Sequence, residues 1–562
     1  MTWGADPWGA APAAPTAAIV ALAAAAASGA LVWVAEIEAA RNGGTAPTGG
    51  TSWGGGPWGA PQDDFAPGGG IETLRVSDLG WRSRDGDPGG VQPYPPYLLD
   101  GPDVERRVAL APGSADTMAW GSLRLAREVS LVGTDTALRR VRIRVGRRSE
   151  DPARGYATDP LAAALVEAFG GVALTWLGDV DGAIVPLRDP AAWLDAPLTA
   201  RRFLGTGGAE GPADLAGTAF PVVRGGTPAA PVRSVPCILV DATKRIYRWT
   251  DGPGTLLAPL QAGAAVFTNA GDVADPQASG SPGAGSYYSS NATGQFRLGS
   301  DPVGQITADG YGGGGVSAAA IVGTILSGLG IPAGLVDATS IALADAAAPW
   351  ISGFAWAGDT TARAALAPLL AGINGRLVAS RGGALRLLLL RAPSAALRPV
   401  TTYDASRAVN VTAVPLGAPL TPPAAAWSVG WGRTHTVNQS PGATVTNPAE
   451  RERLAREWRT ASWSDPANAI RYAQPGRPPL VETALLDATG AASLAAVLGA
   501  LWGVPRALWR VEGAPEDLMA HDLGDAVGLL WNADGLRDGV VGVQVGDGLR
   551  AADATGAALV LT

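Results

Sequence analysis

The segment ALVWVAEIEA, from Ala30 to Ala39, decides whether the N-terminal part of the chain forms strands or a membrane-spanning helix. Val32, Val34 and Ile37 stand among β-favouring neighbours, and Glu36 and Glu38 alternate with apolar residues. Alternation of this kind is typical of a strand with one solvated face. The segment therefore predicts a β-strand.

An alanine-rich run precedes this strand and contains no charge between Asp6 and Glu36. The first cation is Arg41, whereas a secretory signal carries its positive charges before the apolar run. Each aliphatic side chain contributes only about −0.3 to −0.6 kcal/mol to membrane insertion. A soluble helix followed by a strand is therefore favoured, and a membrane anchor and a flexible tail are the alternatives.

The composition of the chain restricts the classes of function that it can have. The chain has 562 residues, 47% of them hydrophobic, which is enough for several domains. The 77 glycines and 45 prolines favour many turns and short strands. A net charge of −8 argues against a general nucleic-acid binder. A single cysteine, Cys237, excludes an intramolecular disulfide, and only His435 and His521 offer imidazole chemistry.

Two similar octads lie on either side of the first strand: WGADPWGA at 3–10 and WGGGPWGA at 53–60. They are interpreted either as compositional drift or as an aromatic docking motif. Residues 42–70 are predicted to be a flexible insertion. The segment IETLRVSDLGW at 71–81 is then the expected hairpin partner of the first strand.

A further strand is predicted at LRRVRIRVGRR, from Leu138 to Arg148. Its period of two places Val141, Ile143 and Val145 on one face and three cations on the other. Those cations, Arg140, Arg142 and Arg144, are the candidate site residues of the chain. They form either a plain solvated face, or a face that lines a channel, meets a neighbouring subunit or contacts a polyanion.

Helical patterns occur in the middle and in the last third of the chain. SAAAIVGTILSGLG at 317–330 repeats at helical spacing, and Asp359 is the expected cap of a second helix. Asn447 and Pro448 predict the start of a third, with Glu450 completing a box-like cap. The segment at 375–390 is predicted to form strands.

No residue is predicted to be catalytic or to bind a cofactor or metal. Gly310 to Gly315 spell GxGxxG, but the preceding segment is short and polar, unlike a buried parallel strand. Glu450, Glu452 and Glu457 alternate with arginines, which indicates ion pairs on a solvated helix. Cys237 lies in VPCILVDA, which is predicted to be a buried strand, and a free cysteine in such a strand is usually part of the core.

The order of these segments resembles that of tail-tip hub proteins of long-tailed phages and gene transfer agents. The resemblance begins with LRVSDLGWRSRDGD, YPPYLLDGPDVERRVAL and GSLRLA. It is stronger in RRFLGTGGAEGPADLAGTAFPVVRGGT and VRSVPCILVDATKRIYRWTDG. AAWSVGWGRTHTVNQ, DATGAASLAAVLGALWG and HDLGDAVGLLW follow in family order. It covers Leu31 to Thr562, and the octads and the insertion at 42–70 depart from the family pattern.

The resemblance implies a mainly β fold with α+β insertions, in which tube-type β-barrel domains alternate with smaller α+β domains. The implied divisions are an N-terminal arm (1–30), a first hub β-barrel (31–200), a β-rich domain (201–304), an α+β domain (305–420) and a second β-barrel (421–562). It further implies a homotrimer whose duplicated barrels mimic the sixfold tail tube.

The implied function is that of a non-enzymatic virion protein at the tail tip, assembled in the bacterial cytoplasm. It would close the tube and gate the passage of DNA. Its implied partners are the distal tail protein, the tape measure protein and tail fibre or receptor-binding proteins, without cofactor or stable membrane insertion. Two alternatives stay open: an exported adhesin that binds glycans through tryptophan, and a tail-associated cell-wall hydrolase.

Overall fold

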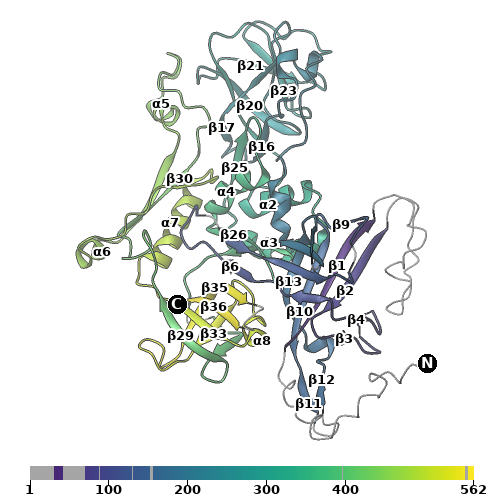
Figure 1. Cartoon of the computed structure of the whole chain (residues 1–562). Coiled ribbons are helices and arrows are strands. Elements are labelled where there is room, and N and C mark those ends of the chain that lie inside the picture. Colours follow the sequence, from purple (N-terminus) through teal and green to yellow (C-terminus); the bar gives the residue numbers. More distant parts are fainter. Residues whose placement is uncertain are drawn as a thin grey trace, which may run out of the picture.

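The structure, a computed structural model, describes residues 31–41, 70–87, 89–114, 116–129, 131–151, 156–180, 182–394, 397–550 and 555–562 (Figure 1). The predicted N-terminal arm, both octads and, apart from Gly70, the predicted insertion lie outside these residues. Strands make up 39% and helices 17% of the structure, so the predicted mainly β fold is confirmed.

The N-terminal sheet is a half-barrel. Its strands in spatial order are β2 (Ile71–Ser77), β1 (Leu31–Arg41), β10 (Arg140–Arg147), β13 (Val166–Ala173), β15 (Gly182–Arg188), β8 (Ser122–Ala126) and β5 (Leu98–Asp100), with β9 (Thr134–Asp135) on β1 and β14 (Leu177–Asp179) on β15. β1 pairs antiparallel with both β2 and β10, which confirms the predicted hairpin. Trp33, Ala35 and Ile37 pack in one core with the apolar face of β10.

The C-terminal sheet draws strands from both ends of the chain. In spatial order it contains β28 (Thr401–Tyr403), β34 (Ala526–Leu529), β35 (Val540–Arg550), β36 (Thr555–Leu561), β33 (Leu508–Gly513) and β29 (Ala408–Val414). The other half of β35 pairs with β6 (Val104–Arg107), which in turn pairs with β7 (Thr117–Ala119). A segment that follows β5 in sequence therefore belongs to the sheet of the last third.

The middle of the chain adds smaller sheets, drawn in teal in Figure 1. One pair is β16 (Val222–Gly225) with β25 (Gly353–Trp356); a second sheet holds β17 (Val232–Pro236), β24 (Ile306–Gly312) and β20 (Gly254–Gln261). A third holds β18 (Ile238–Asp241), β19 (Ile246–Arg248), β23 (Gln295–Leu298), β22 (Ser286–Ser290) and β21 (Thr268–Asp272). Their shared core surrounds Trp249, which is fully buried.

Three helices follow: α2 (Ala318–Gly328), α3 (Ala338–Ala347) and α4 (Ala362–Gly372). They share a core with the hairpin of β26 (Gly375–Ala379) and β27 (Leu385–Leu389). The predicted cap at Asp359 is wrong, because Thr361 stands directly before the helix and its Oγ1 accepts from the Ala364 N–H at 3.3 Å. Asp359 instead pairs with Arg202 at 2.7 Å.

The last third also builds an arm from β30 (Ala426–Trp431), β31 (Arg459–Ser464) and β32 (Val481–Glu482). The helices are α5 (Pro448–Ala455), α6 (Pro466–Arg471), α7 (Ala488–Trp502) and α8 (Pro515–Leu518). The Asn447 cap of α5 is confirmed, since its Oδ1 accepts from the Ala449 N–H at 3.0 Å. Glu450 bonds Arg453 on the helix itself.

Short elements complete the described chain. They are β3 (Trp81–Arg82), β4 (Pro93–Tyr94), β11 (Ser149–Asp151), β12 (Tyr156–Thr158), η1 (Ala162–Ala164), η2 (Pro190–Asp195), η3 (Gly208–Glu210), η4 (Ala213–Leu215) and η5 (Ala333–Leu335). The division of the chain into five parts stays a prediction, because strand pairing does not decide which parts fold as units. Strands β6, β28 and β29 nevertheless join a sheet made mostly of residues beyond 420.

Candidate functional site

The predicted arginine row lies on β10, at the outer face of the half-barrel sheet. Val141, Ile143 and Val145 are fully buried, while Arg140 and Arg142 are exposed. The side chain of Arg144, which follows on the same face, is only 11% exposed. The predicted alternation of apolar and charged residues is thus present in the structure, and the role of the row as lumen or interface is a separate proposal.

Carboxylates of the two neighbouring strands bond this row. Glu36 of β1 stands opposite Arg142 in the strand register, and its Oε1 lies 3.3 Å from an Arg144 nitrogen. Arg142 Nε donates to Glu167 Oε1 of β13 at 2.6 Å. The Arg140 backbone N–H donates to Glu38 at 3.4 Å. The row is therefore the centre of an alternating acid–base ladder across three strands.

These carboxylates are not among the predicted site residues. Glu36 and Glu38 alternate with Ile37 in the opening segment, so their placement on one face of β1 could be read from the sequence. Glu167 gave no such signal, because the register of β10 with β13 shifts between Ile143 and Arg144. A bulge of this kind changes which side chains stand opposite each other.

Aromatic side chains cover one end of the charged face. Trp81 and Tyr94 pack on Val32 and Val34, with ring centroids of the two aromatics 5.0 Å apart. The Tyr94 hydroxyl donates to Glu36, and burial together with this hydrogen bond raises the pKa of Tyr94 to about 12. The charged ladder is therefore covered by aromatic side chains near Val32 and exposed to solvent near Arg142.

Charge balance limits what this face can bind. Arg75 of β2 stands opposite Glu36, so four arginines meet the three carboxylates of Glu36, Glu38 and Glu167. The hydrogen bond that Arg142 donates to Glu167 raises the pKa of Arg142, and burial opposes that shift. A face that supplies its own counter-charges gains little from releasing the counterions of a polyanion. Such a face is therefore not expected to hold a polyanion tightly.

A second charged constellation joins strands β6 and β35 of the C-terminal sheet to the turn between β26 and β27 and to the segment before β34. We call the four residues Arg106, Arg381, Asp522 and Asp547 the buried ion cluster. Arg106 Nε donates to Asp547 Oδ1 at 2.9 Å, and Arg106 Nη1 lies 2.8 Å from Asp522 Oδ1. Arg381 Nη2 lies 3.0 Å from Asp547 Oδ2. The Arg106 and Asp547 side chains are 0% and 1% exposed, so three distant segments are tied together out of water.

The electrostatics of the cluster follow from burial and pairing. Burial alone would lower the pKa of the Arg106 guanidinium, but the carboxylates of Asp547 and Asp522 raise it above its ordinary value. Burial would raise the pKa of Asp522, yet Arg106 and Arg381 lower it. Both shifts favour the charged forms of Arg106 and Asp522, and removing one member of the cluster would leave a buried charge without its partner.

The structure does not bring the three glutamates of helix α5 and its flank, Glu450, Glu452 and Glu457, together with Cys237 into one catalytic or metal site. Glu450, Glu452 and Glu457 pair with Arg453, Arg456 and Arg433 respectively. Burial raises the pKa of the Cys237 thiol well above its ordinary value. Among the described residues, no group of three or more His, Cys, Asp or Glu side chains is placed to hold a metal ion.

The glycines of the GxGxxG match serve packing. Gly310 and Gly312 lie in β24, which is antiparallel to both of its neighbours. A Cβ on Gly310 would lie 2.7 Å from the Trp249 ring, and one on Gly312 would lie 2.2 Å from the Val223 carbonyl oxygen. These glycines let the sheet approach its neighbours closely.

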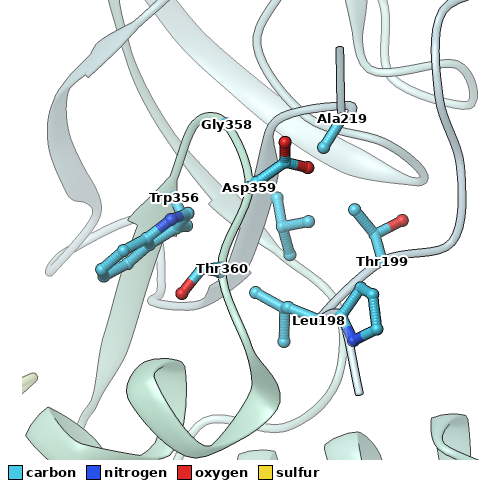
Figure 2. A pocket seen from close by; sticks show the side chains of 9 residues that line it. Leu198, Thr199, Ala219, Trp356, Gly358, Asp359 and Thr360 are labelled. Carbon is cyan, nitrogen blue, oxygen red and sulfur yellow. The ribbon is translucent and has the colours of Figure 1, made fainter. Parts of the chain in front are cut away.

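Two hollows lie elsewhere. Figure 2 shows the smaller one, which Trp356, Asp359, Thr360, Leu198 and Thr199 surround. Its volume of about 10 Å³ has room for no more than one water molecule. The larger is a cleft of about 380 Å³ beside Arg233, which is within the size range of ligand sites.

No family model and no curated protein matches the chain. Among solved structures, it is similar to a chain of the virion of a native gene transfer agent particle. That match has 12% identity and a TM-score of 0.38, and it covers 61% of this chain and 84% of the other.

Two tail proteins are also similar. The 43 kDa tail protein of prophage MuSo2 from Shewanella oneidensis has 8% identity and a TM-score of 0.30, covering 86% of this chain and 96% of its own. A tail protein from Neisseria meningitidis has 12% identity and a TM-score of 0.29, covering 82% and 96%. The chain is thus similar to proteins of the class that its segment order resembles, namely phage tails and gene transfer agents.

Proposed function

We propose that the chain is a structural virion protein, the hub of a tail tip that closes the tail tube and gates the passage of DNA. The observation that carries the proposal is the pair of large β sheets, one made of strands from the N-terminal third of the chain and the other made mostly of strands from its last third. Three copies would supply six such sheets, which is the number needed to continue a sixfold tube. The segment order of the sequence supports the same assignment.

The charged face of the half-barrel has a defined part in this proposal. Arg140, Arg142 and Arg144 would point to the lumen or to the neighbouring subunit. Because Glu36, Glu38 and Glu167 nearly balance them, DNA crossing this face would release few counterions and would not be retained. Transient passage rather than stable binding is the expected mode of contact.

The buried ion cluster would keep β6 and β35 in register and hold the β26–β27 turn against the C-terminal sheet while neighbouring proteins act on the hub. Arg106 and Asp547 are 441 residues apart in sequence yet directly opposite in the register of β6 with β35. The proposed neighbours are the distal tail protein and the tape measure protein on the tube side, and tail fibre or receptor-binding proteins on the other. The proposed location is the virion tail tip, after assembly in the bacterial cytoplasm and without stable membrane insertion.

The two alternatives have specific requirements. A hydrolase needs a convergent acid–base pair, whereas Glu450, Glu452 and Glu457 each bond an arginine. An exported adhesin needs an export signal and exposed tryptophan, whereas Trp249, Trp427 and Trp502 are buried. In the part of the chain that the structure describes, no helix has both the length and the apolar character to cross a membrane.

The test is the mass of the assembly. The full chain is purified together with its neighbouring tail proteins, and the intact complexes are weighed by native mass spectrometry. The proposal expects complexes that contain three copies of this chain. A stable monomer that joins none of the neighbouring proteins under these conditions would contradict it.

A further inference from the structure

Exposed apolar side chains gather at the end of the half-barrel sheet where β9 pairs with β1 (Figure 1). Val132 is 79% exposed, Leu138 46%, Leu174 36% and Leu177 57%. We call these four side chains the apolar end patch. Single exposed aliphatic side chains are ordinary, whereas a group of them on adjoining backbone is typical of a contact site.

Hydrogen bonds hold the two segments of the patch side by side. Thr136 Oγ1 donates to the Leu174 carbonyl at 2.6 Å. Trp176 Nε1 donates to the Thr134 carbonyl at 3.0 Å, and Trp176 packs against the core of the half-barrel. The segment that follows β8 and the segment that follows β13 therefore form one surface.

Leu138 has a backbone conformation that is unusual for leucine. Its φ is 54°, in the left-handed region, where glycine and asparagine are favoured over residues with bulky side chains. The side chain is 46% exposed, so burial in the core does not offset the strain. A contact made by the outward side chain is a physical reason for a leucine at this position.

The segment that joins β1 to β2 begins and ends beside this patch. Arg41, the last residue of β1, stands opposite Thr134 in the strand register, two residues from the patch. Ile71, the first residue of β2, stands opposite the residue before Arg41. Residues 42–69, 28 in all, therefore leave and rejoin the described structure at this end of the sheet.

The chemistry of the connecting segment matches an apolar surface. It carries the octad WGGGPWGA at 53–60, and residues 42–62 contain no charge. Trp53 and Trp58 are 12 and 13 residues from the nearer strand, and a chain of that length spans at most about 40 Å, so both can reach the patch. A tryptophan side chain can bury about 150–250 Å². Reach, the absence of charge and the aromatic content together argue for this octad as the occupant.

We propose that the apolar end patch docks the octad at 53–60 of the same chain, with its tryptophan rings on the aliphatic side chains. The octad at 3–10 is disfavoured, because the chain that carries it enters β1 at Leu31, which pairs with Arg147 at the other end of the strand. The proposal does not rest on the tail-tip function, because it concerns the isolated chain.

The experiment uses the full chain and a fluorescently labelled peptide, acetylated and amidated, of sequence Trp-Gly-Gly-Gly-Pro-Trp-Gly-Ala. Fluorescence anisotropy follows its binding to the unmodified chain and to a variant with Trp53→Ser and Trp58→Ser. The variant should bind the peptide saturably. The unmodified chain should bind it at least about tenfold more weakly, because its own octad competes at an effective concentration on the order of 1 mM. A peptide with serine in place of both tryptophans should not bind.

Further variants localise the binding. In the chain that lacks both tryptophans of the connecting segment, Leu177→Asp or Val132→Asp should weaken the peptide at least about tenfold. Leu239→Asp, on β18, changes a leucine that is 40% exposed, against 57% for Leu177, and should leave binding unchanged. Trp3→Ser with Trp8→Ser, in the otherwise unmodified chain, is the matched control for the other octad and should leave binding as weak as before. Thermal melting verifies that each variant is folded.

The proposal is wrong if the peptide does not bind the chain that lacks Trp53 and Trp58, if the unmodified chain binds it equally well, or if neither aspartate on the patch weakens binding in a folded protein. If the loss of Trp3 and Trp8 opens the patch instead, the octad at 3–10 is the occupant and the assignment is wrong. Sedimentation velocity covers a second copy. If the unmodified chain self-associates and the loss of Trp53 and Trp58 abolishes that self-association, the octad docks between chains, which contradicts docking within one chain.

Discussion

Single residues of the charged face act in pairs across strands. Arg142 bonds Glu167, and Arg144 reaches Glu36, so each cation of the open end has an acidic neighbour on another strand. Arg142 is 44% exposed and Glu167 26%. Exposed pairs of this kind contribute about 0–1 kcal/mol each. These pairs therefore determine the charge pattern of the surface more than the stability of the sheet.

A charge-reversal cycle tests the pairing. Arg142→Glu places a third carboxylate near Glu36 and Glu167 and should lower the free energy of unfolding by about 1 kcal/mol. Glu167→Arg alone should also destabilise, and the double variant should recover most of the loss, measured by urea unfolding. Ile143→Asp is the contrasting variant and should cost about 4 kcal/mol, because an unpaired charge enters the core. Strictly additive effects of the two reversals would show that the pair does not form.

The buried ion cluster is a polar site where a single substitution should be costly. Asp547→Asn leaves Arg106 and Arg381 buried beside one carboxylate less, so the free energy of unfolding should fall by about 3–5 kcal/mol. Asp534→Asn, at a fully exposed carboxylate that pairs with Arg537, is the control and should melt like the unmodified protein. Equal melting temperatures for the two variants would show that the cluster does not stabilise the fold.

His435 gives the fold a specific pH dependence. Burial and the nearby Arg433 lower the pKa of His435 to about 3, whereas the unfolded imidazole titrates near about 6.5. The unfolded chain therefore binds a proton below about pH 6.5 that the folded chain rejects, and stability is lost as the pH falls. The loss approaches about 1.4 kcal/mol per pH unit between these two values.

The measurement compares the unmodified protein with His435→Gln in urea at about pH 7 and about pH 5.5. Relative to the variant, the unmodified protein should lose about 1.4 kcal/mol between the two conditions. Parallel losses in both proteins would mean that the folded imidazole takes up its proton normally.

Among the elements, helix α7 carries Gly499 in its last turns and Gly503 as its C-terminal cap, and both glycines lie against the ring of Trp463. A Cβ on Gly499 would lie 2.2 Å from the Trp463 ring, and one on Gly503 would lie 2.3 Å from it. The ring can therefore lie flat against the helix only where side chains are absent. This contact holds α7 against β31 and positions the whole arm.

Matched glycine substitutions test this contact. Gly499→Ala should destabilise the protein by about 1–3 kcal/mol, because the ring must move. Gly323→Ala, in α2, meets only Ile341 at 3.6 Å and should be neutral or stabilise by up to about 1 kcal/mol through helix propensity. Thermal melting of both variants gives the comparison, and a stabilising effect of Gly499→Ala would contradict the close contact.

Elements with strong local signals could be predicted from sequence. The alternation in β1 and β10, the hairpin of β1 with β2 and the Asn447 cap of α5 all depend on neighbours within a few residues or on simple chain order. The Asp359 cap was wrong because Asp359 and Thr361 are both good caps, and only the observed start of the helix distinguishes them.

At the scale of the whole molecule, the contacts that matter most are those with no local signal. Strand β6 pairs with β35 across more than 400 positions, and Arg106 meets Asp547 there at a separation of 441 residues. A sequence of this composition contains many arginines and aspartates, so nothing marks those two as partners. The candidate arginine row could be found from its period, whereas its carboxylate partners and the cleft beside Arg233 required the fold.

The central claim is that this chain is the hub of a tail tip, and its position in an assembled particle tests that claim most directly. The chain carries a small C-terminal epitope tag, purified particles are decorated with gold-labelled antibody fragments, and the labels are located by electron microscopy. Gold is expected at the end of the tail distal to the capsid, and none on particles from the untagged strain. Gold along the tail shaft or on the capsid, or intact tagged particles that carry no copy of the chain, would contradict it.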